Sequence, residues 1–448
     1  MTLLPSTAKL VAPATVAEIE LSDPASVNYV SIADANCDEL RQALVLVRLH
    51  TRPLATIVAE TVGGLVDAKS CALAARAALR VAPEGIPLPP RLDRQPLLTA
   101  SPSASPQTPE DGRQGKTAGV SDPAITVVVA TRERPKSLAA CLDSLARLDY
   151  SNYEVVVIDN APVMDDTAEL VRQRAKLNVR YAREDRRGLA AAHNRGLQLA
   201  EGGIVAFTDD DVIVDRRWLT EVAEAFKADT NVACVTGLIL AAELQTDAQI
   251  MLETHGHFSK GFEQRVFDLY THRPADPLFP FNAGRLGSGA NMSFDRHKLR
   301  ELGGFDPAIG TGTIARGGDD LAAFFSVIAS GFQLVYQPSA VVWHHHRRNP
   351  NSLAGQAYGY GVGLGAYLTS AMASYPAFIG RALLHAPAGL AYAFRVDSPR
   401  NAHRQGSWPR ELSRLEQRGL AFGPIAYGIS RWRTRGVRQP PAGRVSGR

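Results

Sequence analysis

The chain of 448 residues is too long for one small domain and is sufficient for two or three. Hydrophobic residues make up 45% and charged residues 21% of the sequence, a composition that excludes a disordered or fibrous protein. The formal charge of +4, from 49 basic and 45 acidic residues, is too close to balance to indicate nucleic-acid binding by the whole chain.

The cysteines and the start of the chain favour a reducing compartment. The four cysteines are widely scattered, with no C-x-x-C pair and no spacing to histidine that would build a zinc site. The first residues, MTLLPSTAKLVAPATV, lack the basic segment and the long apolar stretch of a secretory signal. No segment offers about 18 unbroken apolar residues for a spanning helix. We therefore expect a cytoplasmic protein.

Two segments precede the main domain. Residues 1–82 are expected to form a small α/β accessory unit, in which 43–60 reads as two short strands and 67–82 as an alanine-rich helix. Residues 83–123 contain nine prolines and a Ser-rich centre, so they bury too little apolar area to fold. We predict that they form a linker.

The segment 124–348 is predicted to be the main α/β domain. Short continuous apolar runs alternate in it with helical periodicity, and strands that are apolar at nearly every position belong in a sheet covered on both faces. The order strand, helix, strand, helix predicts a mostly parallel, Rossmann-like sheet flanked by helices. The predicted strands are 125–130, 154–158, 179–181 and 204–208, and the predicted helices are about 137–148, 165–176 and 187–200.

Three aspartates directly follow the strand at 204–208. Asp209, Asp210 and Asp211 lie at a carboxyl end of a strand, where open α/β sheets bind ligands. Their mutual repulsion requires a cation, and a hard divalent ion such as Mg²⁺ or Mn²⁺ uses one or two carboxylates together with phosphate oxygens of a substrate. The alternative is a solvated acidic turn or a cap of the next helix.

Eight short motifs follow one another along this domain, and their order is more specific than any one of them. They are ATRERP (130–135), VVVIDN (155–160), RRGLAAAHNRG (186–196), VAFTDDDV (205–212), GSGANMSF (287–294), GGFDP (303–307), GGDDLAAF (317–324) and VVWHHH (341–346). Together they resemble glycosyltransferase family 2, whose members are inverting enzymes with a GT-A type fold that transfer sugars from nucleotide donors. The resemblance covers about 124–348, half of the chain.

The resemblance implies a donor site and a metal site. In the family's D-x-D motif the first aspartate contacts the ribose and the last holds the metal, which here are Asp209 and Asp211. His344 resembles a histidine that completes the metal site in several members, and an imidazole ligand shifts the preference from Mg²⁺ to Mn²⁺. The alternative for His344 is a basic patch at a sheet edge. The donor-binding residues that the resemblance implies are Thr131, Arg132, Glu133, Asp159, Asn194, Asp209 and Asp210.

An inverting displacement also needs a base, because the acceptor hydroxyl must lose its proton as the anomeric carbon is attacked. Asp319 and Asp320 occupy the family's Glu-Asp position, so the resemblance implies Asp320 as the base and Asp319 as a second catalytic carboxylate. A neighbouring carboxylate raises the pKa of such a base. The alternative is capping of the apolar helix that follows. On the acceptor side, the small-residue turn of the family points to Gly289 and Asn291.

The region 349–448 is predicted to be helical with a basic tail. The stretch 349–380 carries no Asp, Glu, Lys or Arg, and its five glycines between 355 and 365 make it unsuitable as a spanning helix. Its Tyr and Leu content suits an interface, and the 13 arginines after residue 380 face only three acidic residues. We predict peripheral contact with the anionic inner face of the plasma membrane. The alternative is that the glycine-rich stretch packs on the catalytic domain and the tail is solvated.

The sequence thus predicts a metal-dependent inverting glycosyltransferase that uses a nucleotide-sugar donor, a glycan or lipid-linked acceptor and Mn²⁺ or Mg²⁺, in cell-envelope or exopolysaccharide assembly. One alternative is a catalytically silent sugar-nucleotide binding module, supported by Asp319 in place of the commoner glutamate. A second is a nucleotidyltransferase, which would need a glycine-rich phosphate loop that ATRERP lacks.

Overall fold

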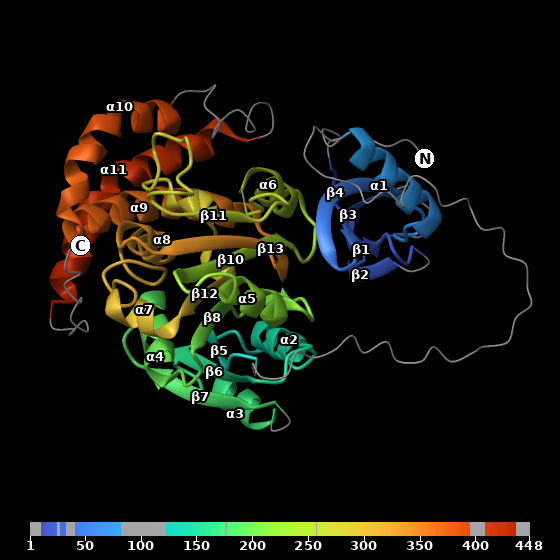
Figure 1. Cartoon of the computed structure of the whole chain (residues 1–448), viewed down its shortest axis with the longest axis horizontal. Helices are drawn as coiled ribbons and strands as arrows, with labels where there is room; N and C mark the ends of the chain where they lie inside the picture. Colours follow the sequence, from blue (N-terminus) through green and yellow to red (C-terminus); the bar gives the residue numbers. More distant parts are fainter. Residues whose placement is uncertain are drawn as a thin grey trace, which may run out of the picture.

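A computed structural model gives the fold of most of the chain (Figure 1). The predicted linker, apart from Asp122 and Pro123, lies outside the described residues, as does the tail after Arg435. The described residues are 10–24, 27–32, 41–81, 122–174, 177–256, 258–394 and 408–435.

The N-terminal unit is a four-stranded sheet with one helix. Its strands lie in the order β2-β1-β3-β4, with β1 parallel to β3 and the other pairs antiparallel. The two strands predicted within 43–60 are β3 and β4, and the predicted helix is α1, whereas β1 and β2 were not predicted. The elements are β1 (Ala14–Glu20), β2 (Val27–Ser31), β3 (Arg41–Leu49), β4 (Arg52–Thr61) and α1 (Ala68–Val81).

Successive side chains of β3 face opposite sides of the N-terminal sheet, and one side packs against the main domain. Val45 and Val47 face α1 in the core of the unit, while Leu44 and Leu46 face the other way and join a buried cluster that includes Trp343 of the main domain. Arg48, which is buried, donates to Glu18 at 2.9 Å and to Asp215 of the main domain at 2.6 Å. The N-terminal unit is therefore packed against the main domain.

The main domain is built on a nine-stranded sheet with the strand order β11-β13-β10-β12-β8-β5-β6-β7, in which β9 also pairs with β13. The pairings β8/β5, β5/β6, β6/β7 and β10/β13 are parallel, and the antiparallel β12 between β8 and β10 leaves those six strands running in one direction. The α/β class with a mostly parallel sheet is thus confirmed. The strands are β5 (Ile125–Thr131), β6 (Tyr153–Asn160), β7 (Val179–Glu184), β8 (Ile204–Asp209), β9 (Val212–Val214), β10 (Val232–Ala241), β11 (Arg265–Phe267), β12 (Met292–Asp295) and β13 (Gln333–His344).

Helices cover both faces of this sheet, as the continuous apolar strands predicted. On β5, Val127 and Val129 pack in one core cluster with Leu142 of α2, and Val128 packs in the other with Phe324 of α8. Several helices are shorter than predicted, because the polar turns at their ends take up one or more residues. The helices before the C-terminal region are α2 (Pro135–Leu145), α3 (Asp166–Arg172), α4 (Leu189–Leu199), α5 (Trp218–Lys227), α6 (Asp247–His255), α7 (Arg296–Glu301) and α8 (Asp319–Ala329), with short 3₁₀ turns η1 (Ala283–Arg285) and η2 (Gly289–Asn291).

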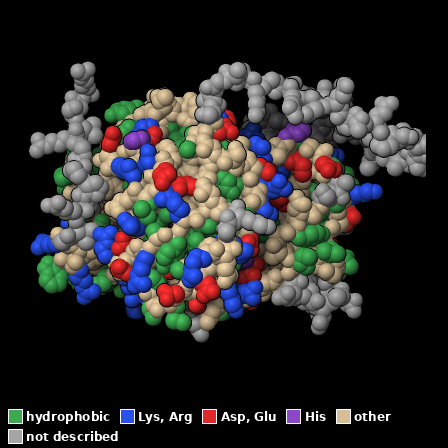
Figure 2. Space-filling model, turned by 90° about the horizontal axis from the view of Figure 1, so that it is seen from below, with side chains coloured by type: hydrophobic (Ala, Val, Ile, Leu, Met, Phe, Trp, Pro, Cys, Tyr) green, Lys and Arg blue, Asp and Glu red, His purple; other side chains and the backbone are tan. Residues whose placement is uncertain are grey.

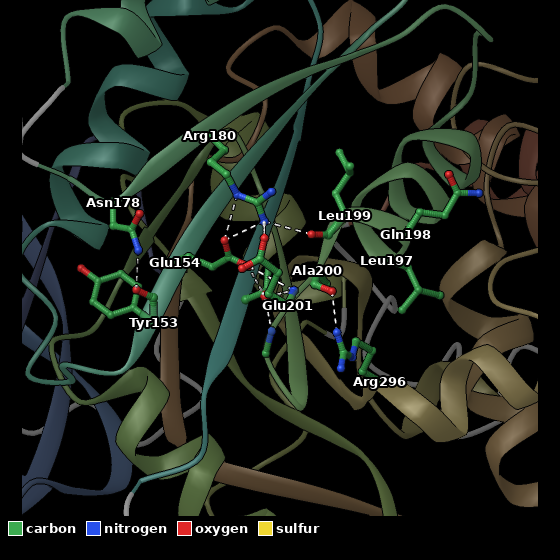
Figure 3. Close-up of polar contacts among 12 residues, drawn as sticks. Tyr153, Glu154, Asn178, Arg180, Leu197, Gln198, Leu199, Ala200, Glu201 and Arg296 are labelled. Atoms are coloured by element: carbon green, nitrogen blue, oxygen red, sulfur yellow. Dashed lines mark hydrogen bonds and ion pairs between the residues drawn. The ribbon is translucent and has the colours of Figure 1, made fainter.

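The two edges of the parallel strands differ in chemistry. At the amino ends, Arg180 at the start of β7 donates to Glu154 at 2.7 Å and to the carbonyl of Leu199 at 2.9 Å (Figure 3). Thr126 of β5 donates to the same Glu154 at 2.7 Å, so the polar groups at this edge satisfy one another. At the carboxyl ends, by contrast, acidic side chains gather, and these form the candidate site.

Three helices complete the C-terminal region: α9 (Pro350–Ser374), α10 (Ile379–Phe394) and α11 (Arg410–Arg433), with the turn η3 (Pro376–Phe378) between α9 and α10. Figure 1 places them at the end of the molecule opposite the N-terminal unit. None of the helices in the described parts of the chain is both long and apolar enough to cross a bilayer. The glycine-rich stretch forms α9, which packs against α8 and α11.

Glycines allow α9 and α11 to approach backbone to backbone. A Cβ on Gly423 of α11 would lie 2.5 Å from the Cα of Gly365 of α9, and a Cβ on Gly361 of α9 would overlap the carbonyl of Glu416. Real Cβ atoms do not come so close to backbone, so these positions fix the spacing of the two helices. By comparison, a Cβ on Gly428, further along α11, would meet nothing within 4 Å.

We expect Gly423→Ala to destabilise the protein by about 1–3 kcal/mol, because the added methyl forces α11 away from α9. The matched control is Gly428→Ala in the same helix, which should stabilise by about 0.5–1 kcal/mol through the higher helix propensity of alanine. Denaturant unfolding of both variants measures the difference. Equal effects of the two substitutions would contradict this packing.

Candidate active site

Three side chains at the carboxyl ends of β8 and β13 form a cluster that can hold a metal ion. Asp209, Asp211 and His344 each offer a ligand atom, and these atoms lie within 4.8 Å of one another. Nε2 of His344 lies 3.3 Å from Oδ1 of Asp211. The meeting follows from topology, because β8 and β13 run in the same direction and so end at the same edge of the sheet.

Electrostatics in this cluster favour a cation. Burial and the charge of Asp211 raise the pKa of Asp209 to about 7. Burial also opposes the charge on Asp211, but the contact with His344 outweighs it and lowers the pKa of Asp211 to about 2. Two carboxylates that cannot both ionise easily, together with an imidazole, are a donor set that fits Mn²⁺.

Asp210 is not one of the three cluster residues and is held by Thr131, the last residue of β5, and by Arg134. Thr131 donates to Oδ2 of Asp210 at 2.7 Å, and Arg134 donates to Oδ1 of Asp210 at 3.0 Å. The same nitrogen of Arg134 lies 3.0 Å from Oδ2 of Asp211. Arg134 therefore offsets part of the repulsion between the neighbouring carboxylates.

The predicted nucleoside-binding residues follow β5 and β6 at the same edge. Glu133 adopts a left-handed φ of 54° and accepts hydrogen bonds from the backbone N–H groups of Val163 and Met164. Asp159 is fully buried and accepts from the hydroxyl of Tyr181 at 3.1 Å, while its other oxygen has no hydrogen-bond partner. Burial raises the pKa of Asp159. Arg132 donates to the carbonyl of Ala161 at 3.3 Å.

Asp320 lies in the first turn of α8 and is held by two backbone donors. The N–H of Gly289 donates to its Oδ2 at 2.9 Å, and the N–H of Leu321 donates to its Oδ1 at 2.8 Å. Burial and the charge of Asp319 raise the pKa of Asp320 to about 6. A carboxylate with this pKa is suited to accept a proton near neutral pH.

Two hydrogen bonds through η2 connect Asp320 to the acidic cluster. Gly289, the first residue of η2, holds Asp320, and the carbonyl of the next residue, Ala290, accepts from the hydroxyl of Thr208 at 2.9 Å. Thr208 directly precedes Asp209 in β8. The predicted base and the candidate metal ligands therefore belong to one site.

Comparison with known proteins identifies the domain that carries this site. Residues 126–285 match the profile described as glycosyl transferase family 2. The central domain of the chain belongs to glycosyl transferase family 2. The D-x-D aspartates and the first four of the eight motifs fall within the matched residues, whereas Asp320 and His344 lie after them.

Relatives of this family 2 domain cover about half of the chain. It is 27% identical over 226 residues to the pre-mycofactocin glycosyltransferase of Mycobacterium tuberculosis (strain H37Rv), matching 50% of this chain and 43% of the relative. It is 30% identical over 226 residues to the poly-beta-1,6-N-acetyl-D-glucosamine synthase of Staphylococcus aureus (strain COL), matching 49% of each protein. The chain thus spans about half the length of the curated relatives that it matches.

Two further proteins are similar. The glucosyl-dolichyl phosphate glucuronosyltransferase of Haloferax volcanii is 22% identical over 194 residues, which cover 42% of this chain and 57% of that protein. A solved structure of the mannosyltransferase PcManGT from Pyrobaculum calidifontis, in complex with GDP-Man and Mn²⁺, aligns with a TM-score of 0.41 and 19% identity over 72% of this chain and 78% of that one.

Two predicted binding residues of the family 2 domain face inward instead. The side chain of Asn291 is buried, donates to the carbonyls of Leu238 and Ala340, and accepts from the indole N–H of Trp218. The hydrogen bonds of Asn291 are thus made within the core, and a bond from Asn291 to an acceptor, which would have to replace one of them, stays a prediction. The conformation of η2 turns this side chain inward and leaves the backbone N–H of Gly289 facing Asp320.

Asn194 of α4 is occupied in a similar way. Its amide nitrogen donates to the carbonyl of Phe305 at 2.7 Å, and its oxygen accepts from the N–H of Phe305 at 2.9 Å. The side chain therefore holds the GGFDP turn against α4, and the donor contact that the resemblance implied for Asn194 stays a prediction. The preceding residue, His193, is buried between Phe207 and Phe305, with Nδ1 3.4 Å from Oδ2 of Asp319.

The sequence did not reveal two contributors to the candidate site. Arg134 lies within the ATRERP motif, and its position beside the predicted donor-binding residues Arg132 and Glu133 could have indicated that it belongs to the site. Gly289 contributes its backbone N–H, and every residue type except proline has this group, so the sequence carries no signal for it.

We expect His344→Gln to weaken binding of Mn²⁺ to the protein in the presence of UDP or GDP by at least tenfold, because one of three ligands loses its imidazole nitrogen. Isothermal titration or electron paramagnetic resonance of free Mn²⁺ measures this. The control is His345→Gln, since Nδ1 of His345 faces Glu243 at 3.9 Å, away from the cluster. Unchanged Mn²⁺ affinity in His344→Gln would remove His344 from the metal site.

Proposed function

We propose that the protein transfers a sugar from a nucleotide-sugar donor to a hydroxyl of a glycan or lipid-linked acceptor, with inversion at the anomeric carbon. The proposal rests on one observation: hydrogen bonds to residues of η2 connect Asp320 with the end of β8, where the acidic cluster lies. The family 2 domain supports a sugar-transfer reaction. Cell-envelope or exopolysaccharide assembly is the proposed setting.

Donor binding falls to the loops after β5, β6 and β8. Asp159 has a buried oxygen with no hydrogen-bond partner, which suits it to accept from an N–H of a base. Asp209 is the last residue of β8, and Asp210 follows it at the same edge of the sheet. Thr131 and Arg134 hold Asp210 by hydrogen bonds. These residues would hold the nucleoside and orient the diphosphate toward the acidic cluster.

A divalent cation, Mn²⁺ in preference to Mg²⁺, would be held by Asp211 and His344, with Asp209 beside them. Oδ1 of Asp211 is buried and makes no hydrogen bond apart from its 3.3 Å approach to His344. When bound, the ion supplies charge neutralisation for the departing nucleoside diphosphate. A bound cation would also favour the ionised form of Asp209, whose pKa is about 7 without one.

Asp320 would take the proton of the acceptor hydroxyl. The acceptor oxygen forms a bond to the anomeric carbon as the bond to the diphosphate oxygen breaks, and the hydroxyl proton passes to the carboxylate of Asp320. The backbone donors from Gly289 and Leu321 fix that carboxylate, so it does not have to reorganise during the reaction. Asp319, buried beside His193, raises the pKa of Asp320 through its charge.

The names of the relatives narrow the acceptor class. One relative is a synthase of an N-acetylglucosamine polymer, and another acts on a sugar carried by dolichyl phosphate. By analogy we propose a glycan or a lipid-linked sugar as the acceptor here. Screening UDP-, GDP- and dTDP-sugars for Mn²⁺-dependent release of nucleotide tests the donor side of the proposal.

Transfer by the parental protein should fall about tenfold per pH unit below pH 6, because protonation of Asp320 removes the base and burial has raised its pKa to about 6. Asp320→Asn should retain donor binding but lose transfer by a factor of about 10²–10⁴. Steady-state rates between pH 5 and 8.5, with donor binding by titration calorimetry, measure both effects.

The matched control is Glu224→Gln, which removes an exposed carboxylate paired with Lys227 on α5. It should leave rate and pH profile unchanged. Transfer by Asp320→Asn at the parental rate would refute the assignment of the base. Donor affinity without turnover in the parental protein would instead favour the silent binding module.

A further inference from the structure

The helix α10 carries its large apolar side chains on the outside. Ile379, Leu383, Leu384 and Leu390 are 41%, 69%, 75% and 59% exposed. The side turned toward the domain carries small or charged residues instead, and Arg381 donates there to the carbonyl of Phe279 at 3.0 Å. This distribution is the reverse of that of a helix on a water-facing surface.

The last turns of α11 present a similar surface. Ile425, Ile429 and Trp432 are exposed, and Arg431 and Arg433 are exposed beside them. Among the described residues, seven of the sixteen large hydrophobic side chains that are exposed lie on α10 and α11. Figure 1 shows both helices at the end of the molecule that is remote from the N-terminal unit.

The charges next to these apolar residues are of one sign. Residues 376–394 contain Arg381 and no Asp or Glu, and residues 417–435 contain four arginines and no Asp or Glu. Elsewhere the surface is mixed: the face shown in Figure 2 has acidic, basic and hydrophobic side chains interspersed. Exposed leucines and a tryptophan together with arginines are the composition of a helix that lies in the interface of a bilayer.

We propose that the outward face of α10, together with the last turns of α11, rests on an anionic lipid bilayer. The apolar side chains enter the boundary between headgroups and acyl chains, and the arginines contact the lipid phosphates. A second copy of this chain is a poorer occupant, because a symmetric contact would bring arginines against arginines with no carboxylate on either side.

This assignment moves the lipid contact from the segment that the sequence indicated. Residues 350–374 form α9. Glycines of α9 pack against α11 and against the loop before α8, so these neighbours cover much of the surface of α9. Among the described side chains of α9, only Tyr360 is an exposed large hydrophobic residue, whereas four such residues lie on α10, from Ile379 onward. The lipid contact is therefore a property of α10 and α11, and not of the glycine-rich helix.

The position of α10 connects this surface to the acceptor side of the site. Its inner side packs beside Leu278, and Arg381 holds the carbonyl of Phe279. The same segment runs on through η1 to Gly289, which holds Asp320. If the proposed function is correct, a sugar acceptor carried on a lipid would be presented near this end of the site. This last step rests on the proposed function, whereas the lipid contact itself does not.

Flotation of the full chain with vesicles tests the proposal. The chain should bind vesicles of 30% phosphatidylglycerol in phosphatidylcholine at least tenfold more strongly than vesicles of phosphatidylcholine alone. The double substitution Leu383→Glu and Leu384→Glu should lower binding to the anionic vesicles at least tenfold. The matched control is Leu73→Glu on α1, which changes a side chain of similar exposure, 57%, and should bind as the parental chain does.

A second readout does not depend on a substitution in α10. Brominated lipid in the anionic vesicles should quench part of the tryptophan fluorescence, and Trp432→Phe should remove most of that quenching, because Trp218 and Trp343 are buried and Trp408 is partly buried. Thermal unfolding of each variant checks that it folds. Nucleotide release with a water-soluble acceptor should be unchanged in the α10 variant, so a failure of the proposed activity is distinguishable from a failure of lipid binding.

Three outcomes would overturn the proposal. The first is parental binding of anionic vesicles by the folded α10 variant, and the second is equal binding to neutral and anionic vesicles. The third is a dimer in sedimentation velocity that the α10 substitutions convert to a monomer without any change in vesicle binding, which would assign the surface to a second copy of the chain.

Discussion

The site depends on the repulsion among three successive carboxylates at one strand end. Asp209, Asp210 and Asp211 are held there by the pairing of β8, so the chain cannot separate them. Arg134 and His344 offset part of the repulsion, but Asp209 still has a raised pKa of about 7 because burial and Asp211 oppose its charge. The fold therefore keeps three carboxylates together, and an additional positive charge would favour the ionised form of all three.

The direction of the strands explains how residues far apart in the sequence meet these carboxylates. His344 lies 133 positions after Asp211, yet both occur at the carboxyl ends of strands that run the same way. Because β12 enters antiparallel between β8 and β10, it brings the backbone of η2 to the same edge, where Gly289 holds Asp320. One reversed strand thus connects the acidic cluster with the proposed base.

The sequence predicted the parts of this arrangement that depend on strand ends. Apolar runs followed by polar residues were sufficient to place Thr131, Asp159 and Asp209 at one edge, since parallel strands end together. It could not predict side-chain direction within a turn, so Asn291 was expected to face a ligand and faces the core. The sequence also did not predict β1 and β2 of the N-terminal sheet, where Ala14 of β1 additionally bridges to Leu244 of the main domain.

From composition, the glycine-rich stretch was expected either to contact a membrane or to pack on the catalytic domain, and its contacts with the loop before α8 and with α11 show the packing. Gly363 of α9 lies against the loop before α8, where a Cβ on Gly318 would come within 2.6 Å of the Gly363 carbonyl. Gly318 has a φ of +90° and directly precedes Asp319 and Asp320, so the approach of α9 fixes the turn that presents both carboxylates. On its other side α9 is held by Gly419 and Gly423 of α11. The C-terminal helices therefore support the proposed base through backbone contacts, and α10, which continues from α9 through η3, is connected to the same support.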